Sequence, residues 1–178
     1  GSVARLARGF RSPIGLRAGV RQVALEGEGF FDVARDGRPF LVQTHDATVR
    51  VLGTRFDVRA DPALDAEQRA AGGTRVVVEE GRVAVASRDG SGRSVELGGG
   101  EGTALVGDAP LTARRVEVAR LATWRTGGFA AIDEPLAVVL AELQRRVGVS
   151  ITLEAGAATV ERTRERVSLF YPRIPAAE

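Results

Sequence analysis

Residues 49–58 read VRVLGTRFDV, and this stretch decides the fold class. Apolar and polar side chains alternate on both sides of its central glycine, which is the pattern of half-buried β-strands. The inward positions are Val49 and Val51 in the first half, and Phe56 and Val58 in the second. Odd positions give way to even ones, so the inward face changes register at the glycine. A glycine at such a change predicts a bulge or a sharp bend.

Three further segments share one plan, in which a strand is followed by an acidic and glycine-rich turn and then by a second strand. They are residues 25–33 (LEGEGFFDV), 78–85 (VEEGRVAV) and 97–105 (LGGGEGTAL). Glycine supplies the positive φ that a tight hairpin needs, so each segment predicts a hairpin. Many short strands with frequent turns predict a mainly β fold, a sandwich or jelly roll. We expect residues 61–73 to be a surface excursion.

The pattern changes after residue 118. An apolar strand is expected at 129–132, a helix start at 133–135, and a helix ending at a C-cap at Gly148. Its apolar positions recur at helical spacing, at Leu136, Val139, Leu140, Leu143 and Val147. Further strands are expected at 149–153 and 166–170. We therefore predict a β domain over residues 1–118 and a small, incomplete α/β (βαβ) domain over residues 119–178.

Composition excludes several classes of function. The 178 residues carry 25 basic and 23 acidic side chains, and the basic ones are arginines scattered along the chain. A nucleic-acid surface needs a clustered basic stripe, so no nucleic-acid partner is expected. The absence of cysteine excludes disulfides, thiol catalysis and cysteine-based zinc sites. No apolar run is long enough to span a bilayer. Gly1 and Ser2 resemble a cloning remnant, so we expect a piece of a longer protein.

Catalytic and metal-binding patterns are missing from the sequence. His45 is the only histidine, and a metal site on a β barrel usually needs two or three. The pair His45-Asp46 is expected in a turn between strands. No serine stands in a nucleophile-elbow motif, and residues 89–92 resemble a hairpin loop rather than a calcium loop. We therefore expect no enzyme activity, no cofactor and no metal.

Several segments, in order and spacing, resemble the FecR family of sigma-factor regulators. They are RQVALEGEGFFDV (21–33), RPFLV (38–42), VRVLGTRFDV (49–58), VEEGRVAV (78–85), ATWRTGGF (122–129) and DEPL (133–136). The matching motif positions are Gly27, Glu28, Phe30, Pro39, Phe40, Gly53, Thr54, Phe56 and Gly81. Phe30, Phe40 and Phe56 are expected in the core of the β domain, and Glu28 is expected to order a turn.

The resemblance implies a periplasmic domain of a single-pass inner-membrane protein. Such a domain relays the occupancy of a TonB-dependent outer-membrane transporter, as in the regulation of iron transport, to an extracytoplasmic-function (ECF) sigma factor. The contact with the transporter is through its N-terminal signalling domain. The sigma factor binds a cytoplasmic segment, and this segment and the membrane-spanning helix are both absent from this chain. The C-terminal α/β unit resembles part of the signalling-domain fold known as STN.

The resemblance also suggests candidate sites. Residues for partner binding or for the domain junction are Trp124, Phe129, Pro135, Leu136, Glu142, Arg145 and Arg146. Trp124 is expected to pack the two domains together, and the polar side of the helix with Glu142 is expected to face solvent. Some family members cleave themselves at a Gly-Thr bond that matches Gly53-Thr54. There, a threonine hydroxyl can attack a strained preceding carbonyl.

Three other readings remain open at this stage. A carbohydrate-binding β sandwich would need an exposed aromatic platform, and a β-barrel enzyme would need a catalytic cluster. An envelope structural domain would need neither. An open strand edge could also pair two copies of the chain as a homodimer.

Overall fold

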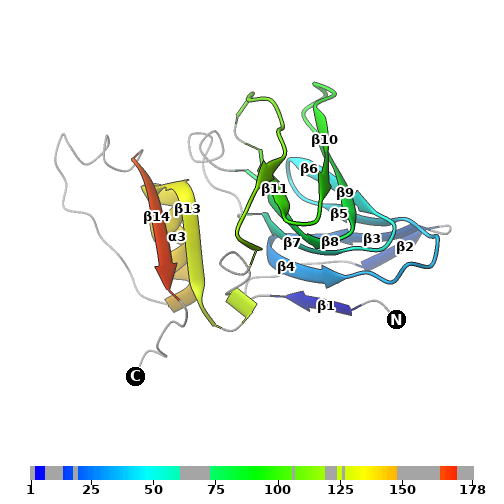
Figure 1. Ribbon diagram of the computed structural model, residues 1–178, viewed down its shortest axis with the longest axis horizontal. Coiled ribbons are helices and arrows are strands. Elements are labelled where there is room, and N and C mark those ends of the chain that lie inside the picture. The colour runs from blue at the N-terminus through cyan, green and yellow to red at the C-terminus, as the bar shows by residue number, and fades with distance from the viewer. Residues whose placement is uncertain are drawn as a thin grey trace.

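Two six-stranded sheets make up most of the protein. The structure is a computed structural model and describes residues 3–6, 14–17, 20–60, 73–105, 107–118, 124–125, 127–147 and 165–171. Sheet A has the order β1 (Val3–Leu6), β4 (Gly27–Asp32), β7 (Arg55–Ala60), β8 (Arg75–Glu80), β11 (Glu101–Ala104) and β12 (Arg114–Arg115). Sheet B has the order β10 (Ser94–Gly98), β9 (Arg82–Ser87), β6 (Ala47–Val51), β5 (Phe40–Gln43), β3 (Val20–Ala24) and β2 (Ile14–Arg17). The two sheets stack face to face (Figure 1).

The core lies between the two sheets and is built mainly from valine and phenylalanine. Phe31 of sheet A stacks on Phe56, with ring centroids 5.2 Å apart, and meets Phe40 of sheet B at 5.7 Å. The four inward positions predicted in residues 49–58 are all buried. Residues 76–78 are buried as well, because sheet A is covered on both faces at β8. The predicted mainly β sandwich is therefore confirmed.

The three expected hairpins at residues 25–33, 78–85 and 97–105 are wrong. In each case the two strands belong to different sheets, so the chain crosses from one sheet to the other. The same holds for residues 49–58, where β6 lies in sheet B and β7 in sheet A. A sheet-to-sheet corner and a hairpin both need a glycine that reverses the chain, so the local sequence does not separate them.

The register change in residues 49–58 follows from this crossing. Each sheet sets its own inward face, so the parity of inward positions is free to change between β6 and β7. The predicted bend is therefore confirmed, and a bulge lies just beyond it, where the β7–β8 register shifts between Arg55 and Phe56. The hairpin loop predicted at residues 89–92 is also confirmed, because it joins the antiparallel pair β9 and β10.

A smaller unit follows the sandwich. Strand β13 (Phe129–Pro135) pairs antiparallel with β14 (Arg166–Tyr171), and helix α3 (Leu136–Val147) packs on the pair. Its small core contains Phe129, Ala131 and Val139, with Leu143 and Val167 packed against them. We call residues 124–171 the C-terminal segment. None of the described helices is long and apolar enough to cross a bilayer.

The expected helix start at residues 133–135 is wrong, because these residues continue β13. Pro135 is paired with Arg166, and Leu136 N–H donates to the Glu165 carbonyl at 2.8 Å. Proline is tolerated in an edge strand, and β13 is one of only two strands in its sheet. The strand therefore ends at Pro135, and the helix begins one residue later. The strand at 166–170 is confirmed as β14. The C-cap at Gly148, the strand at 149–153 and all but the last residue of the predicted excursion at 61–73 lie outside the described residues.

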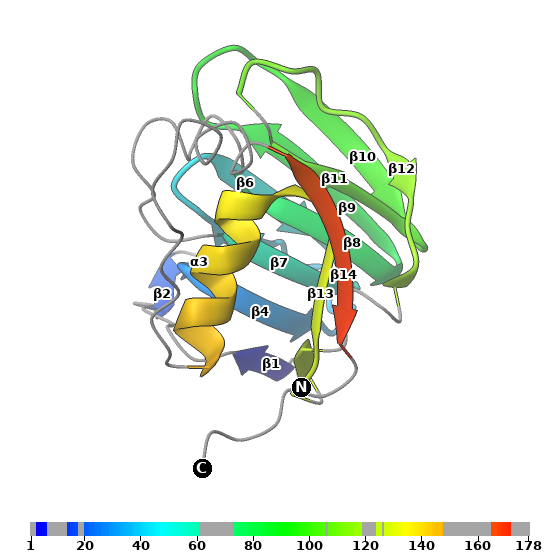
Figure 2. The same ribbon diagram turned by 90° about the vertical axis from the view of Figure 1, so that its left-hand side faces the viewer.

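The C-terminal segment lies against the outer face of sheet A. Figure 2 shows α3 and β13 in front of β4 and β7, with β14 beside β13. An ion pair joins α3 to β7, and Ala130 of β13 lines a small cavity together with residues of β4, β7 and β8. Charged residues of β4 and β7 are buried on this face of the sheet.

Candidate functional site

The outer face of sheet A is polar, yet much of it is buried. Strand β7 points Phe56 and Val58 into the core, so Asp57 and Arg59 must point outward. Both are nearly inaccessible, with 6% and 5% of their surface exposed, and Glu28 on the neighbouring strand is 7% exposed. Buried charged groups need partners, because removing them from water is costly. The C-terminal segment provides partners for Asp57 and Arg59.

Trp124 and Arg125 hold the beginning of the C-terminal segment on this face. The Trp124 indole N–H donates to Asp57 Oδ1 at 3.0 Å. Arg125 Nη2 donates to Asp57 Oδ2 at 3.1 Å, and its Nη1 donates to Glu79 Oε2 at 3.3 Å. The guanidinium also lies over the Phe30 ring, 4.0 Å from its centroid. A planar guanidinium is well suited to bridging two carboxylates while it stacks on a ring.

Helix α3 supplies a second charged contact. Glu142 Oε2 lies 3.8 Å from Arg59 Nη2, and the two side chains are 2% and 5% exposed. Beside this pair is a small cavity, which is lined by Glu28, Asp57, Arg59, Arg75, Val77 and Ala130. We call Asp57, Arg59, Glu79, Trp124, Arg125 and Glu142 the junction cluster. It joins strands β7 and β8 of the sandwich to the C-terminal segment at two separate places.

Burial has a direct effect on one member of the junction cluster. It raises the pKa of Asp57 from 3.8 to about 6, and the nearby charge of Glu79 acts in the same direction. The positive charge of Arg125 and the hydrogen bond from Trp124 oppose this rise in the pKa but do not cancel it. A carboxyl group with this pKa changes charge in the mildly acidic range.

The structure gives four different outcomes for the predicted junction residues. Trp124 lies at the junction, where it contacts the sandwich as expected. Phe129 is fully buried in the small core under α3, while Pro135 ends β13 and Leu136 begins the helix. The expectation that Glu142 faces solvent is wrong, because this side of α3 lies on a polar sheet face. Arg145 and Arg146 belong to α3, but their side chains lie outside the described residues.

Sequence reasoning missed four residues of the junction cluster: Asp57, Arg59, Glu79 and Arg125. Two signals were present. Arg125 follows Trp124 directly in the junction motif, and the outward parity of Asp57 and Arg59 follows from the inward parity of Phe56. What the sequence did not show is that a second element covers this face.

Two of the motif phenylalanines lie in the core as predicted, and the third does not. Phe40 and Phe56 belong to the core between the sheets. Phe30 is buried on the opposite face of sheet A, under Arg125, and Phe31 takes the core position. Glu28 lies within β4 rather than in a turn, because residues 27–32 are all paired with β7. The prediction for Glu28 is therefore wrong.

The remaining motif positions lie at the corners and loops of the sandwich. Gly27 and Gly81 stand at crossings between the sheets, with φ of 98° and 97°. The carbonyl of Pro39, just before β5, accepts a hydrogen bond from Arg21 N–H at 3.2 Å. These positions shape the corners and do not form a site by themselves.

The bond between Gly53 and Thr54 lies at the β6–β7 crossing. The Thr54 hydroxyl is buried and donates to the Arg82 carbonyl at 2.8 Å, while the Gly53 carbonyl accepts from Arg35 Nε at 3.3 Å. The φ of Gly53 is not in the left-handed region, so this geometry provides no backbone strain there. Arg82 offers a carbonyl, which is not a base that could activate the hydroxyl.

We therefore expect the bond between Gly53 and Thr54 to stay intact. Purified protein kept at neutral pH for days should give one intact mass, and Thr54→Ala should give the same result apart from the mass of the substitution. Two fragments that divide between residues 53 and 54 in the wild type, and that are absent in Thr54→Ala, would contradict this expectation.

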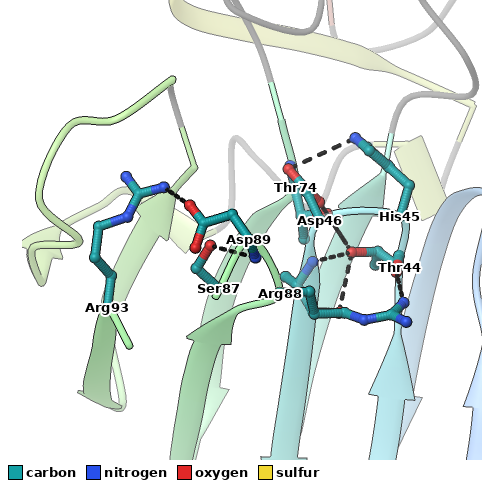
Figure 3. A network of polar contacts seen from close by, with 9 residues as sticks. Thr44, His45, Asp46, Thr74, Ser87, Arg88, Asp89 and Arg93 are labelled. Carbon is teal, nitrogen blue, oxygen red and sulfur yellow. Dashed lines mark hydrogen bonds and ion pairs between the residues drawn. The ribbon is translucent and has the colours of Figure 1, made fainter. Parts of the chain in front are cut away.

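A second polar network ties the two sheets together at one end of the sandwich (Figure 3). The Asp46 carboxylate accepts from the Thr44 hydroxyl at 3.0 Å and from the Thr74 N–H at 3.0 Å, and Arg88 donates to the Thr44 carbonyl. His45 lies in the β5–β6 turn, as predicted, with Nε2 3.6 Å from Asp46 Oδ2. These polar groups all find their partners within the fold, which indicates a structural role for the network.

The described residues contain no group of three or more His, Cys, Asp or Glu side chains that could hold a metal ion.

Comparisons with known proteins agree with this architecture. A crystal structure of a candidate anti-sigma factor from Parabacteroides distasonis ATCC 8503 matches with a TM-score of 0.79 and 24% identity, over 98% of this chain and 78% of that chain. Another crystal structure, with the same description and organism, matches with a TM-score of 0.69 and 28% identity, over 82% and 66%. A comparison with curated proteins found no match. The family described as FecR protein matches residues 13–84. This match falls within the sandwich and agrees with the resemblance to the FecR family seen in the sequence.

Proposed function

We propose that this chain is the periplasmic signal-transducing part of a FecR-type regulator. It relays the occupancy of a TonB-dependent outer-membrane transporter to an ECF sigma factor by protein–protein contact. The observation that carries the proposal is the junction cluster, which couples a FecR-family sandwich to a second unit through buried ion pairs. The structural relatives from Parabacteroides distasonis, described as candidate anti-sigma factors, support a regulatory role.

The C-terminal segment presents a surface that suits a protein partner. Leu169 and Phe170 on β14 are 40% and 46% exposed, and neighbouring strand residues point to opposite faces. Both faces of β14 therefore offer apolar side chains to solvent. We assign the contact with the transporter's N-terminal signalling domain to this strand, because exposed apolar side chains on an ordered element are typical of docking surfaces.

In this proposal the remaining steps belong to parts of the regulator outside this chain. A membrane-spanning helix anchors the domain to the inner membrane, and a cytoplasmic segment binds the sigma factor. The domain itself contributes recognition and a mechanical link, with no catalytic step. Pairing of two copies stays a prediction, and the oligomeric state of the purified chain would measure it.

Binding to the transporter is the direct test. The chain is titrated with the purified signalling domain of the transporter encoded nearest to it, and saturable binding in about the micromolar range is expected, typical of a transient signalling contact. Leu169→Asp should weaken binding by about tenfold or more, because a charge replaces an apolar contact. The matched control is Leu52→Asp, since Leu52 is 55% exposed at a corner of the sandwich.

The outcomes separate clearly. Equal loss of binding in both variants would place the contact elsewhere or indicate an unspecific effect. No binding by the folded wild type would remove this transporter as the partner, and with it the relay as proposed.

A further inference from the structure

The junction cluster buries an ionisable group under contacts that can be made or broken together. Asp57 belongs to the sandwich, whereas Trp124 and Arg125, which both donate to its carboxylate, are consecutive residues at the start of the C-terminal segment. Release of this segment from sheet A would therefore expose the carboxyl group and remove both donors in one step. Docking is thus coupled to the environment of a single carboxyl group.

The charges around Asp57 come from every element packed against it. Glu28 lies on β4, Arg55 and Arg59 on β7, Arg75 and Glu79 on β8, and Arg125 on the C-terminal segment. Glu142 of α3 pairs with Arg59, which lies two residues from Asp57 on β7. The only histidine of the chain, His45, lies in the turn between β5 and β6 and belongs to the network of Figure 3.

We propose that Asp57, Trp124 and Arg125 form a proton-linked latch, which holds the C-terminal segment on sheet A more tightly in mild acid than at neutral pH. Protonation does not release Arg125, because its Nη1 still pairs with Glu79 at 3.3 Å. The neutral carboxyl group of Asp57 can still accept the indole N–H of Trp124. Protonation therefore removes the cost of a buried charge while the main contacts remain.

The direction of the effect follows from proton linkage. When the segment is docked, burial raises the pKa of Asp57 to about 6, whereas a solvated aspartate has its usual value of 3.8. The docked form therefore binds the proton more tightly, and docking strengthens as the pH falls through 6. From about pH 7 to about pH 5, the docking constant should rise about tenfold. Any regulatory use of this latch rests on the proposed function, but the latch itself does not.

Trp124 is a direct reporter of this equilibrium, because it is the only tryptophan of the chain and it contacts Asp57. The experiment is a urea titration of the whole chain, followed by Trp124 emission at several pH values between about 5 and 7.5. We expect the undocking midpoint to move to higher urea as the pH falls, by an amount equal to about a tenfold change in the docking constant.

Three variants make the test specific. Asp57→Asn should remove the pH dependence, and His45→Gln should leave it unchanged, which excludes titration of the imidazole as its cause. Arg125→Gln removes an attraction that lowers the pKa of Asp57, so the pH at which docking strengthens should move upward. The Arg125→Gln variant keeps the test decisive if Asp57→Asn fails to fold.

A pH-independent midpoint in the wild type would overturn the latch. So would a pH dependence that persists in Asp57→Asn, or one that Arg125→Gln leaves at the same pH. None of these measurements includes a partner, so failure of the latch and failure of the transporter contact are distinguishable.

Discussion

Gly81→Ala is expected to lower the free energy of unfolding of the sandwich by about 3 kcal/mol, from positive φ and a steric clash together. Gly81 makes the β8–β9 crossing with a φ of 97°. A Cβ at this position would lie 2.9 Å from Thr54 Oγ1 and 3.0 Å from the Gly53 carbonyl oxygen. The second crossing, between β6 and β7, runs directly beside the first, so neither corner can move without the other. Urea unfolding followed by circular dichroism measures the effect.

The matched control for this substitution is Gly90→Ala. Gly90 has a similar φ of 81°, but nothing lies within 4 Å of the position of its added Cβ. The Gly90→Ala substitution should therefore lower the free energy of unfolding by only about 1 kcal/mol, the part that comes from backbone conformation. Equal losses in the two variants would show that the packing of the two corners against each other contributes nothing.

These two glycines also show where sequence reasoning succeeds and where it fails. Both follow a strand and precede another, and both were expected in hairpins, but only Gly90 lies in one. Parity identifies which residues of a strand face inward, and here it placed Val49, Val51 and Phe56 correctly. It does not say in which sheet the next strand lies, because that depends on contacts between residues far apart in the chain.

The candidate site was only partly predictable for a related reason. The junction motif led to Trp124, and alternation along β7 puts Asp57 outside the sandwich core. An outward position normally predicts solvent, and that inference fails here because α3 and β13 cover this face of sheet A. The polar side of α3 was assigned to solvent by the same reasoning. Two polar surfaces that bury each other leave no apolar pattern to be read from either one.

Glu142→Ala should strongly weaken the docking of α3 on sheet A. It tests whether the buried charges hold the junction together. Removal of Glu142 leaves Arg59 buried without its acidic partner on α3, and breaking a buried ion pair typically costs about 3–5 kcal/mol. The docked position of α3 should therefore be lost while the sandwich stays folded. Hydrogen exchange of residues 136–147 and a red shift of Trp124 emission would measure this release.

The matched control is Glu80→Ala, which breaks the pair between Glu80 and Arg35. Both of these side chains are more than 60% exposed, so we expect no change in α3 exchange and a loss of less than about 1 kcal/mol. The double variant Arg59→Met/Glu142→Leu replaces the buried pair by apolar side chains and should recover most of the docking. If Glu142→Ala left the exchange of α3 unchanged, the pair between Arg59 and Glu142 would not be what holds the helix in place.

The double variant also separates stability from regulation. A well-packed apolar pair can hold α3 as firmly as an ion pair does, but it is less sensitive to the charges around it. In the double variant the junction should stay closed, and the pH dependence that comes from Asp57 should remain, because Trp124 and Arg125 are untouched. The two contacts of the junction would then have distinct roles: Arg59 and Glu142 hold the helix in place, and Asp57 makes its docking depend on pH.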